Sequence, residues 1–252
     1  MAFLVFLTLI PATVSASLAL VGPVDNVGTK KADGPQQYNY FAYGSNMASA
    51  TMTSLRGIEP VASTAAVLPG HRLRFNVPGD RLIEPSWASV EPIAEADRRV
   101  AASQVGIPCE DEEIMHGVLY RLTEEDFSRI LRSEGVPFGY RVHRCRVVPY
   151  AGDSVDAGMC ALSESGALGS SVSAYTLRAA RKEWRDGPDI APSQSYLDVL
   201  IRGAREYGLD AEYVTYLEGM EGHRSFLPLI GDGIAGKVLD LSMWFDNLSG
   251  RN

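Results

Sequence analysis

Residues 40–46 read Tyr40-Phe41-Ala42-Tyr43-Gly44-Ser45-Asn46. The aromatic run that begins at Tyr38 is typical of a β-strand, and it stops at a Gly-Ser-Asn trio that supports positive φ and a tight turn. A buried strand that ends in such a turn can direct several backbone N–H groups at one point, which suits a carboxylate or a developing oxyanion. An ordinary strand followed by an ordinary turn explains the same residues.

A second segment, about ninety residues further on, predicts a helix with well-defined ends. Thr123 is a good N-cap because three acidic residues follow it, and acidic side chains favour the first turn of a helix. Phe127, Ile130 and Leu131 form an apolar stripe at helical spacing. Gly135 predicts the end of this helix.

Glu134 is therefore expected at the C-terminal edge of that helix. The negative end of the helix dipole disfavours an ionised carboxyl there, and apolar neighbours (Leu131, Val136 and Phe138) act in the same direction by removing water. A carboxyl in this position can take up a proton in one step and return it in another. The alternative is an exposed glutamate at a helix end, paired with Arg132 or Arg141.

The remaining elements predict an α+β fold. Strands are expected at 38–43, 72–77, 86–91, 116–122, 140–149 and 157–162. Ser193 caps a helix that closes at Gly208, and another helix runs from about Asp210 to Met220. Strands come first and helices gather late, which favours α+β over a doubly wound parallel sheet. Segments 93–113 and 163–173 are interpreted as surface insertions or as lids over a pocket.

Composition excludes several classes of protein. The chain has 252 residues, 46% of them hydrophobic, with a net charge of −8, so it can bury a full core and it lacks the basic character of a nucleic-acid-binding protein. The cysteines (Cys109, Cys145 and Cys160) are odd in number and show no zinc spacing, and the histidines stand alone. We therefore predict no metal site and no cofactor.

Three regions are predicted along the chain. Residues 1–37 form an N-terminal extension, in which 1–16 contain an apolar run without a charged flank and 22–37 resemble a flexible lead-in. Residues 38–222 form the catalytic domain, and 223–252 form a C-terminal extension. The apolar run is too short to span a membrane.

Two motifs together indicate a family. The chain resembles the γ-glutamylcyclotransferases, in which a Tyr-Phe-Ala-Tyr-Gly-Ser-Asn strand lines the pocket and a Glu-Gly-Val element carries the catalytic glutamate. Residues 40–46 match the first motif in full, and Ser133-Glu134-Gly135-Val136 matches the second. His116 to Leu122 and Tyr140 to Val142 are similar to the strands that enter and leave that helix, and Pro192-Ser193-Gln194-Ser195-Tyr196 is similar to a segment that brings a tyrosine to the pocket.

The resemblance implies a small mixed β-barrel-like sheet with surrounding helices, and an enzyme that needs no cofactor. In the implied reaction the α-amine of a γ-glutamyl group attacks its own side-chain carbonyl, which releases 5-oxoproline and the amino acid or amine. Glu134 would be the general acid/base. Substrate binding would fall to Tyr40, Phe41, Ala42, Tyr43, Gly44, Ser45, Asn46 and Tyr196, with turn amides as oxyanion donors and the hydroxyls of Tyr43 and Tyr196 on the α-carboxylate.

Other interpretations differ in class. Ser45 is a poor nucleophile because no G-x-S-x-G elbow surrounds it. A non-catalytic module that binds γ-glutamyl groups or peptides is the alternative to an enzyme. The leaving group, the pathway and the oligomeric state stay open, although some similar proteins process glutathione-derived conjugates in the biosynthesis of toxins. A cytoplasmic location is expected, with the secretory pathway as the alternative if residues 1–16 act as a signal peptide.

Overall fold

The computed structural model describes residues 36–81, 83–93, 114–150 and 171–223. Its elements are β1 (Gln37–Ala42), the short helical turns η2 (Ser45–Met47) and η3 (Thr51–Leu55), β2 (Ala62–Pro69), β3 (His71–Asp80), β4 (Glu84–Pro92), β5 (Ile114–Thr123), α3 (Glu124–Ser133), β6 (Tyr140–Tyr150), β7 (Val172–Ala179), α5 (Lys182–Asp186), α6 (Gln194–Glu206) and α7 (Ala211–Glu218). The predicted strand at 157–162 and nearly all of the segments 93–113 and 163–173 lie outside the described residues.

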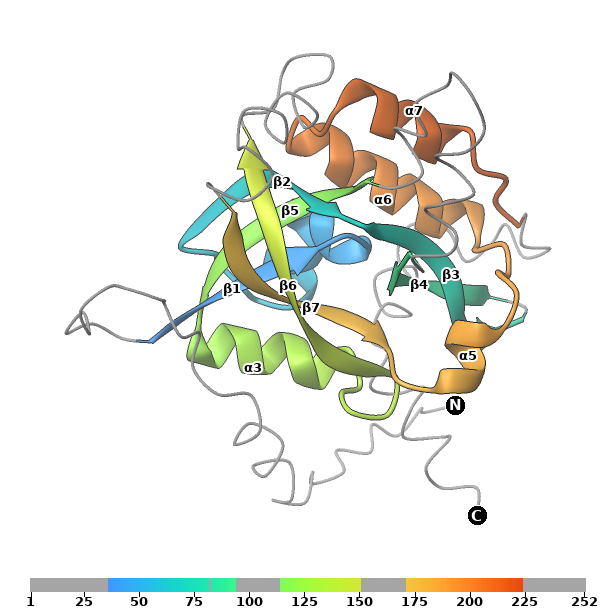
Figure 1. Ribbon diagram of the computed structural model, residues 1–252, viewed down its shortest axis with the longest axis horizontal. Helices are drawn as coiled ribbons and strands as arrows, with labels where there is room; N and C mark the ends of the chain where they lie inside the picture. The colour runs from blue at the N-terminus through green and yellow to red at the C-terminus, as the bar shows by residue number, and fades with distance from the viewer. Residues whose placement is uncertain (1–35, 82, 94–113, 151–170, 224–252) are drawn as a thin grey trace, which may run out of the picture.

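Five strands close into a barrel in the order β1, β5, β2, β6, β7, and β3 pairs with β4 in a separate two-stranded sheet (Figure 1). β7 pairs in parallel with β1 through Tyr175 and Tyr40, while the other described strand pairs of the barrel are antiparallel. α3 lies on one side of the barrel, and α6 and α7 lie on the other (Figure 1). This arrangement confirms the predicted α+β fold with a small mixed barrel.

The sequence does not predict two of the barrel strands, β2 and β7. β2 is rich in alanine, and its residues 65–68 are all buried, so it lacks the alternation of apolar and polar side chains that marks a half-exposed strand. The segment 163–173, interpreted as a surface insertion or a lid, overlaps the start of β7, where Val172 pairs with Val147 of β6. Both strands become recognisable only when their neighbours in the barrel cover them.

Local hydrogen bonds explain the two helices that flank the pocket. The Thr123 side chain accepts from the Asp126 amide at 3.1 Å at the start of α3, and Gly135 ends this helix at φ +64°. The Ser193 side chain likewise accepts from the Tyr196 amide at 3.1 Å at the start of α6. Both predicted helices are confirmed, and Glu134 is the C-cap of α3.

Candidate active site

A small pocket lies where β1 ends, with a cavity volume of about 20 Å³, which is room for about one water molecule. Its lining residues come from β1 and its turn, from the C-terminal end of α3 and from β4, β6, β7 and α6: Tyr40, Tyr43, Gly44, Ser45, Asn46, Ala88, Glu134, Tyr140, Leu177 and Tyr196. The structure thus brings together seven of the nine predicted site residues, which span the chain from Tyr40 to Tyr196.

Phe41 and Ala42 do not line this pocket. Both are fully buried in the core, and the Phe41 ring packs so closely on β5 that a Cβ added to Gly117 would lie 2.8 Å from it. The alternation of side chains along a strand turns Phe41 to the face opposite Tyr40. Ala42 shares the face of Tyr40, but its short side chain is fully buried and does not reach the pocket. The expected direct role of these two residues in substrate binding is therefore not supported by their position.

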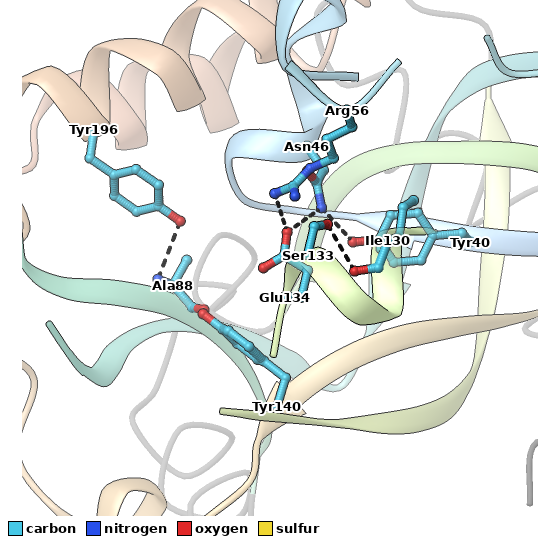
Figure 2. Close-up of polar contacts among 9 residues, drawn as sticks. All are labelled: Tyr40, Asn46, Arg56, Ala88, Ile130, Ser133, Glu134, Tyr140 and Tyr196. Atoms are coloured by element: carbon cyan, nitrogen blue, oxygen red, sulfur yellow. Dashed lines mark hydrogen bonds and ion pairs between the residues drawn. The ribbon is translucent and has the colours of Figure 1, made fainter. Parts of the chain in front are cut away.

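Glu134 is 6% exposed, and its carboxylate receives two hydrogen bonds on one oxygen. Asn46 Nδ2 donates to Glu134 Oε1 over 2.8 Å, and Arg56 Nη2 donates to the same oxygen over 2.5 Å (Figure 2). Asn46 Nδ2 also donates to the Tyr40 hydroxyl over 3.0 Å. The turn after β1 and the end of α3 are thereby joined by a buried ion pair.

This geometry corrects two expectations about Glu134. The alternative of an exposed glutamate paired with Arg132 or Arg141 is wrong, because the carboxylate is buried and its cation is Arg56. Phe138, expected to shield it from water, is itself 65% exposed. The sequence gives no indication of Arg56, which follows the short turn η3 and has no motif around it.

Gly44 is needed for space and not for its backbone conformation. Its φ is −110°, so the expected positive φ is absent. A Cβ at this position would lie 3.1 Å from the Tyr196 hydroxyl oxygen, tighter than most real contacts. Gly44 therefore allows Tyr196 to approach the turn closely.

The pocket tyrosines use their hydroxyl groups in different ways. Tyr43 donates to the Leu177 carbonyl over 2.6 Å, and Tyr140 donates to the Ala88 carbonyl over 2.7 Å. The Tyr196 oxygen accepts from the Ala88 amide at 3.4 Å, and within the described residues no acceptor takes its proton (Figure 2). Burial raises the pKa of Tyr43, Tyr140 and Tyr196, so these phenols stay protonated. Tyr196 is therefore the better hydrogen-bond donor to a ligand. Tyr43 lines the pocket, but its hydroxyl proton is already donated to the Leu177 carbonyl.

The turn after β1 is a single 3₁₀ turn, in which the Met47 amide donates to the Gly44 carbonyl at 2.9 Å. The preceding amides, of Ser45 and Asn46, come first in this turn and have no acceptor within it. The pocket beside them contains no histidine among its lining residues that could activate Ser45. In the parts of the chain that the structure describes, no three His, Cys, Asp or Glu side chains gather as metal ligands.

Glu84 of β4 holds the helix that carries Tyr196. It is 4% exposed, its Oε1 accepts from the Ser193 amide at 2.8 Å, and its Oε2 accepts from the Ser193 hydroxyl. Burial raises the pKa of Glu84 to about 7, while the hydrogen bonds from Ser193 act in the opposite direction. No motif in the sequence marks this contact.

We expect Glu84 to make folding stability depend on pH. Because its folded pKa of about 7 exceeds the ordinary value of 4.5, the native state keeps a proton that the unfolded chain has lost. The contribution of Glu84 to the free energy of unfolding therefore falls as pH rises from about 4.5 to about 7. The loss is at most about 3 kcal/mol. Urea unfolding at several pH values should show this slope in the wild type and in the control Glu59→Gln. The same slope in Glu84→Gln would refute the assignment.

In the described residues, no helix has the length and apolar character needed to cross a membrane.

Comparisons with known proteins agree with this geometry. Residues 114–217 match the AIG2-like family. The chain is 28% identical to the γ-glutamyl cyclotransferase gliK of Aspergillus fumigatus, covering 81% of this chain and 69% of that protein. It is 29% identical to the γ-glutamyl cyclotransferase aclK of Aspergillus oryzae, covering 71% of this chain and 59% of the relative. A solved structure named γ-glutamyl cyclotransferase superimposes with a TM-score of 0.53 at 16% identity, over 81% of this chain and 98% of the other, which shows a shared fold. The resemblance seen in the two motifs is thus confirmed.

Proposed function

We propose that this chain, which has the fold of the γ-glutamylcyclotransferases and resembles them in sequence, is itself a γ-glutamylcyclotransferase that converts a γ-glutamyl group to 5-oxoproline and releases an amino acid or amine. The observation that carries the proposal is the buried carboxylate of Glu134 inside the pocket formed by Tyr40 to Asn46 and Tyr196. Such a site offers a proton acceptor, fixed amide donors and a phenol, which are the groups that this cyclisation needs.

Glu134 is the proposed general acid/base. The substrate ammonium gives a proton to the carboxylate, and the freed amine attacks the side-chain carbonyl carbon, so that a C–N bond forms and the carbonyl oxygen becomes an oxyanion. The amide C–N bond then breaks, and Glu134 passes the proton to the departing nitrogen. The attacking nitrogen, which starts as an ammonium, loses two protons in all. The departing nitrogen gains two protons, because it leaves as an ammonium. Glu134 transfers these protons one at a time.

The turn and the tyrosines supply binding groups in this proposal. The amides of Ser45 and Asn46 stabilise the oxyanion, and the Tyr196 hydroxyl donates to the α-carboxylate. Tyr40 and Tyr43 form the walls, and Gly44 keeps the backbone accessible. A γ-glutamyl group is much larger than a cavity of about 20 Å³, so we infer that the walls move apart when substrate enters.

The finer assignments are part of the same proposal. The catalytic domain is residues 38–222, with 1–37 and 223–252 as extensions. The substrate is a small γ-glutamyl compound, as the names of the two fungal relatives suggest. A glutathione-derived conjugate in the synthesis of a secondary metabolite is the finer form of this proposal. Glutathione chemistry is mostly intracellular, which favours the cytoplasm. The competing hypothesis is a non-catalytic module that binds γ-glutamyl groups, and a buried carboxylate in the pocket favours the enzyme.

A substrate panel tests this function. Purified protein should release 5-oxoproline from at least one γ-glutamyl donor among dipeptides, amines, glutathione and glutathione conjugates, with both products identified by mass spectrometry. Binding of a donor without release of 5-oxoproline would support the non-catalytic module, and neither binding nor release would contradict both.

A further inference from the structure

We propose that Arg56 is a positioning residue that holds its positive charge against the Glu134 carboxylate and leaves only one of the carboxylate oxygens, Oε2, for proton transfer. This inference rests on the proposed function and adds to it the orientation and the charge environment of the acid/base group. It is carried by the contacts that surround the carboxylate.

Arg56, Asn46 and Glu134 form a closed triangle of hydrogen bonds (Figure 2). Arg56 Nη2 lies 2.5 Å from Glu134 Oε1, Asn46 Nδ2 lies 2.8 Å from the same oxygen, and Arg56 Nε lies 2.7 Å from Asn46 Oδ1. The Asn46 amide is oriented by this set, because its oxygen faces a donor and its nitrogen faces an acceptor. Three groups that fix one another in this way leave the carboxylate little freedom to rotate.

The two oxygens of Glu134 therefore differ. Oε1 has two donors, whereas none of the described residues donates to Oε2, which lies on the side of the carboxylate away from Asn46 and Arg56 (Figure 2). A carboxylate oxygen without a donor can receive a proton without first breaking a hydrogen bond. We assign the proton transfers to Oε2.

The charge of Arg56 lies against the carboxylate in a buried place. The Arg56 side chain is 5% exposed, and it donates a charge-assisted hydrogen bond to Glu134, which is stronger than a bond between neutral groups. A general base must be ionised before it can accept a proton, and a neighbouring cation favours the ionised form of a carboxyl group.

The other ionisable groups that face Glu134 do not replace Arg56. These are the phenols of Tyr40, Tyr43, Tyr140 and Tyr196, and burial raises the pKa of each, so they are neutral over the working range of pH. Glu91 also faces Tyr43, but it is paired with Arg178 at 2.5 Å. Arg56 is the cation paired with Glu134 among the described residues.

The test compares Arg56→Met and Arg56→Lys with the wild type. Because a neighbouring cation favours the ionised form of a carboxyl group, its removal in Arg56→Met should move the acidic limb of kcat/KM to higher pH. Its kcat at neutral pH should fall about tenfold to a hundredfold, because a displaced catalytic group costs this much. KM should change much less. Arg56→Lys should restore the acidic limb, since the charge returns, but not the full kcat, because the link to Asn46 is lost.

Arg205→Met is the matched control, since Arg205 is 64% exposed and pairs with Glu218 at 2.6 Å, and neither residue lines the pocket. It should keep the wild-type pH profile. An Arg56→Met protein that is folded by circular dichroism and keeps the wild-type acidic limb would overturn the inference, as would a loss of activity without a change in the profile in both Arg56 variants. Failure of the proposed function itself would appear differently, as a wild-type protein that releases no 5-oxoproline.

Discussion

Glu134→Gln is expected to lower kcat for the release of 5-oxoproline by about a hundredfold to ten-thousandfold, the contribution of a well-placed acid/base group. The amide oxygen of glutamine can still accept hydrogen bonds from Asn46 and Arg56, so the pocket should keep its shape. Its nitrogen cannot take up a proton at neutral pH. Steady-state kinetics should therefore show a loss in kcat, and calorimetry should show that the γ-glutamyl donor still binds.

Glu91→Gln is the control for this experiment. Glu91 is also buried, at 4% exposure, and is paired with an arginine, Arg178, at 2.5 Å, but it does not line the pocket. Both substitutions remove one charge from a buried Glu–Arg pair and should lower stability to a similar degree. Only the change at Glu134 should lower kcat to this extent. A Glu134→Gln protein with wild-type kcat would exclude Glu134 as the acid/base.

Gly203→Ala is expected to damage both stability and activity. Gly203 lies in α6, where an added Cβ would come within 2.5 Å of the Ala48 amide nitrogen and 2.7 Å of the Met47 carbonyl carbon. Both contacts are with backbone, so α6 and the turn after β1 must move apart. Such overpacking costs about 1–3 kcal/mol, which offsets or exceeds the gain of about 1 kcal/mol when alanine replaces glycine in a helix.

The displacement matters because α6 carries Tyr196 and the turn carries Gly44. The free energy of unfolding, measured in urea, should fall, and kcat/KM should fall further than the loss of folded protein explains. Gly219→Ala is the matched control, because the nearest atoms to its added Cβ lie at 3.5 and 3.6 Å, an ordinary distance. Equal behaviour of the two alanine variants would contradict the close packing of α6 on the turn.

Features that depend on near neighbours in the chain could be predicted from the sequence. The strand at β1, the capped helices α3 and α6 and the place of Glu134 at the end of α3 all follow from caps, glycines and periodicity within a few residues. The family resemblance added the barrel and the arrangement of the pocket. The resemblance places Phe41 and Ala42 in the site only because they belong to a contiguous motif.

Features that depend on distant partners needed the tertiary structure. Arg56 and Glu134 are 78 residues apart, and Glu84 and Ser193 are 109 residues apart, so no local pattern connects either pair. The same is true of the Tyr43 hydroxyl, which donates to a carbonyl 134 residues away. The strand β2 shows no alternation because residues 65–68 are all buried by their neighbours in the fold. The sequence by itself thus determined the turn after β1 and the place of Glu134 at the end of α3, since short-range hydrogen bonds and helix ends fix both. Only the tertiary structure decided the charge beside that carboxylate and which hydroxyl remains available to a ligand, because burial brings together groups that the chain keeps far apart.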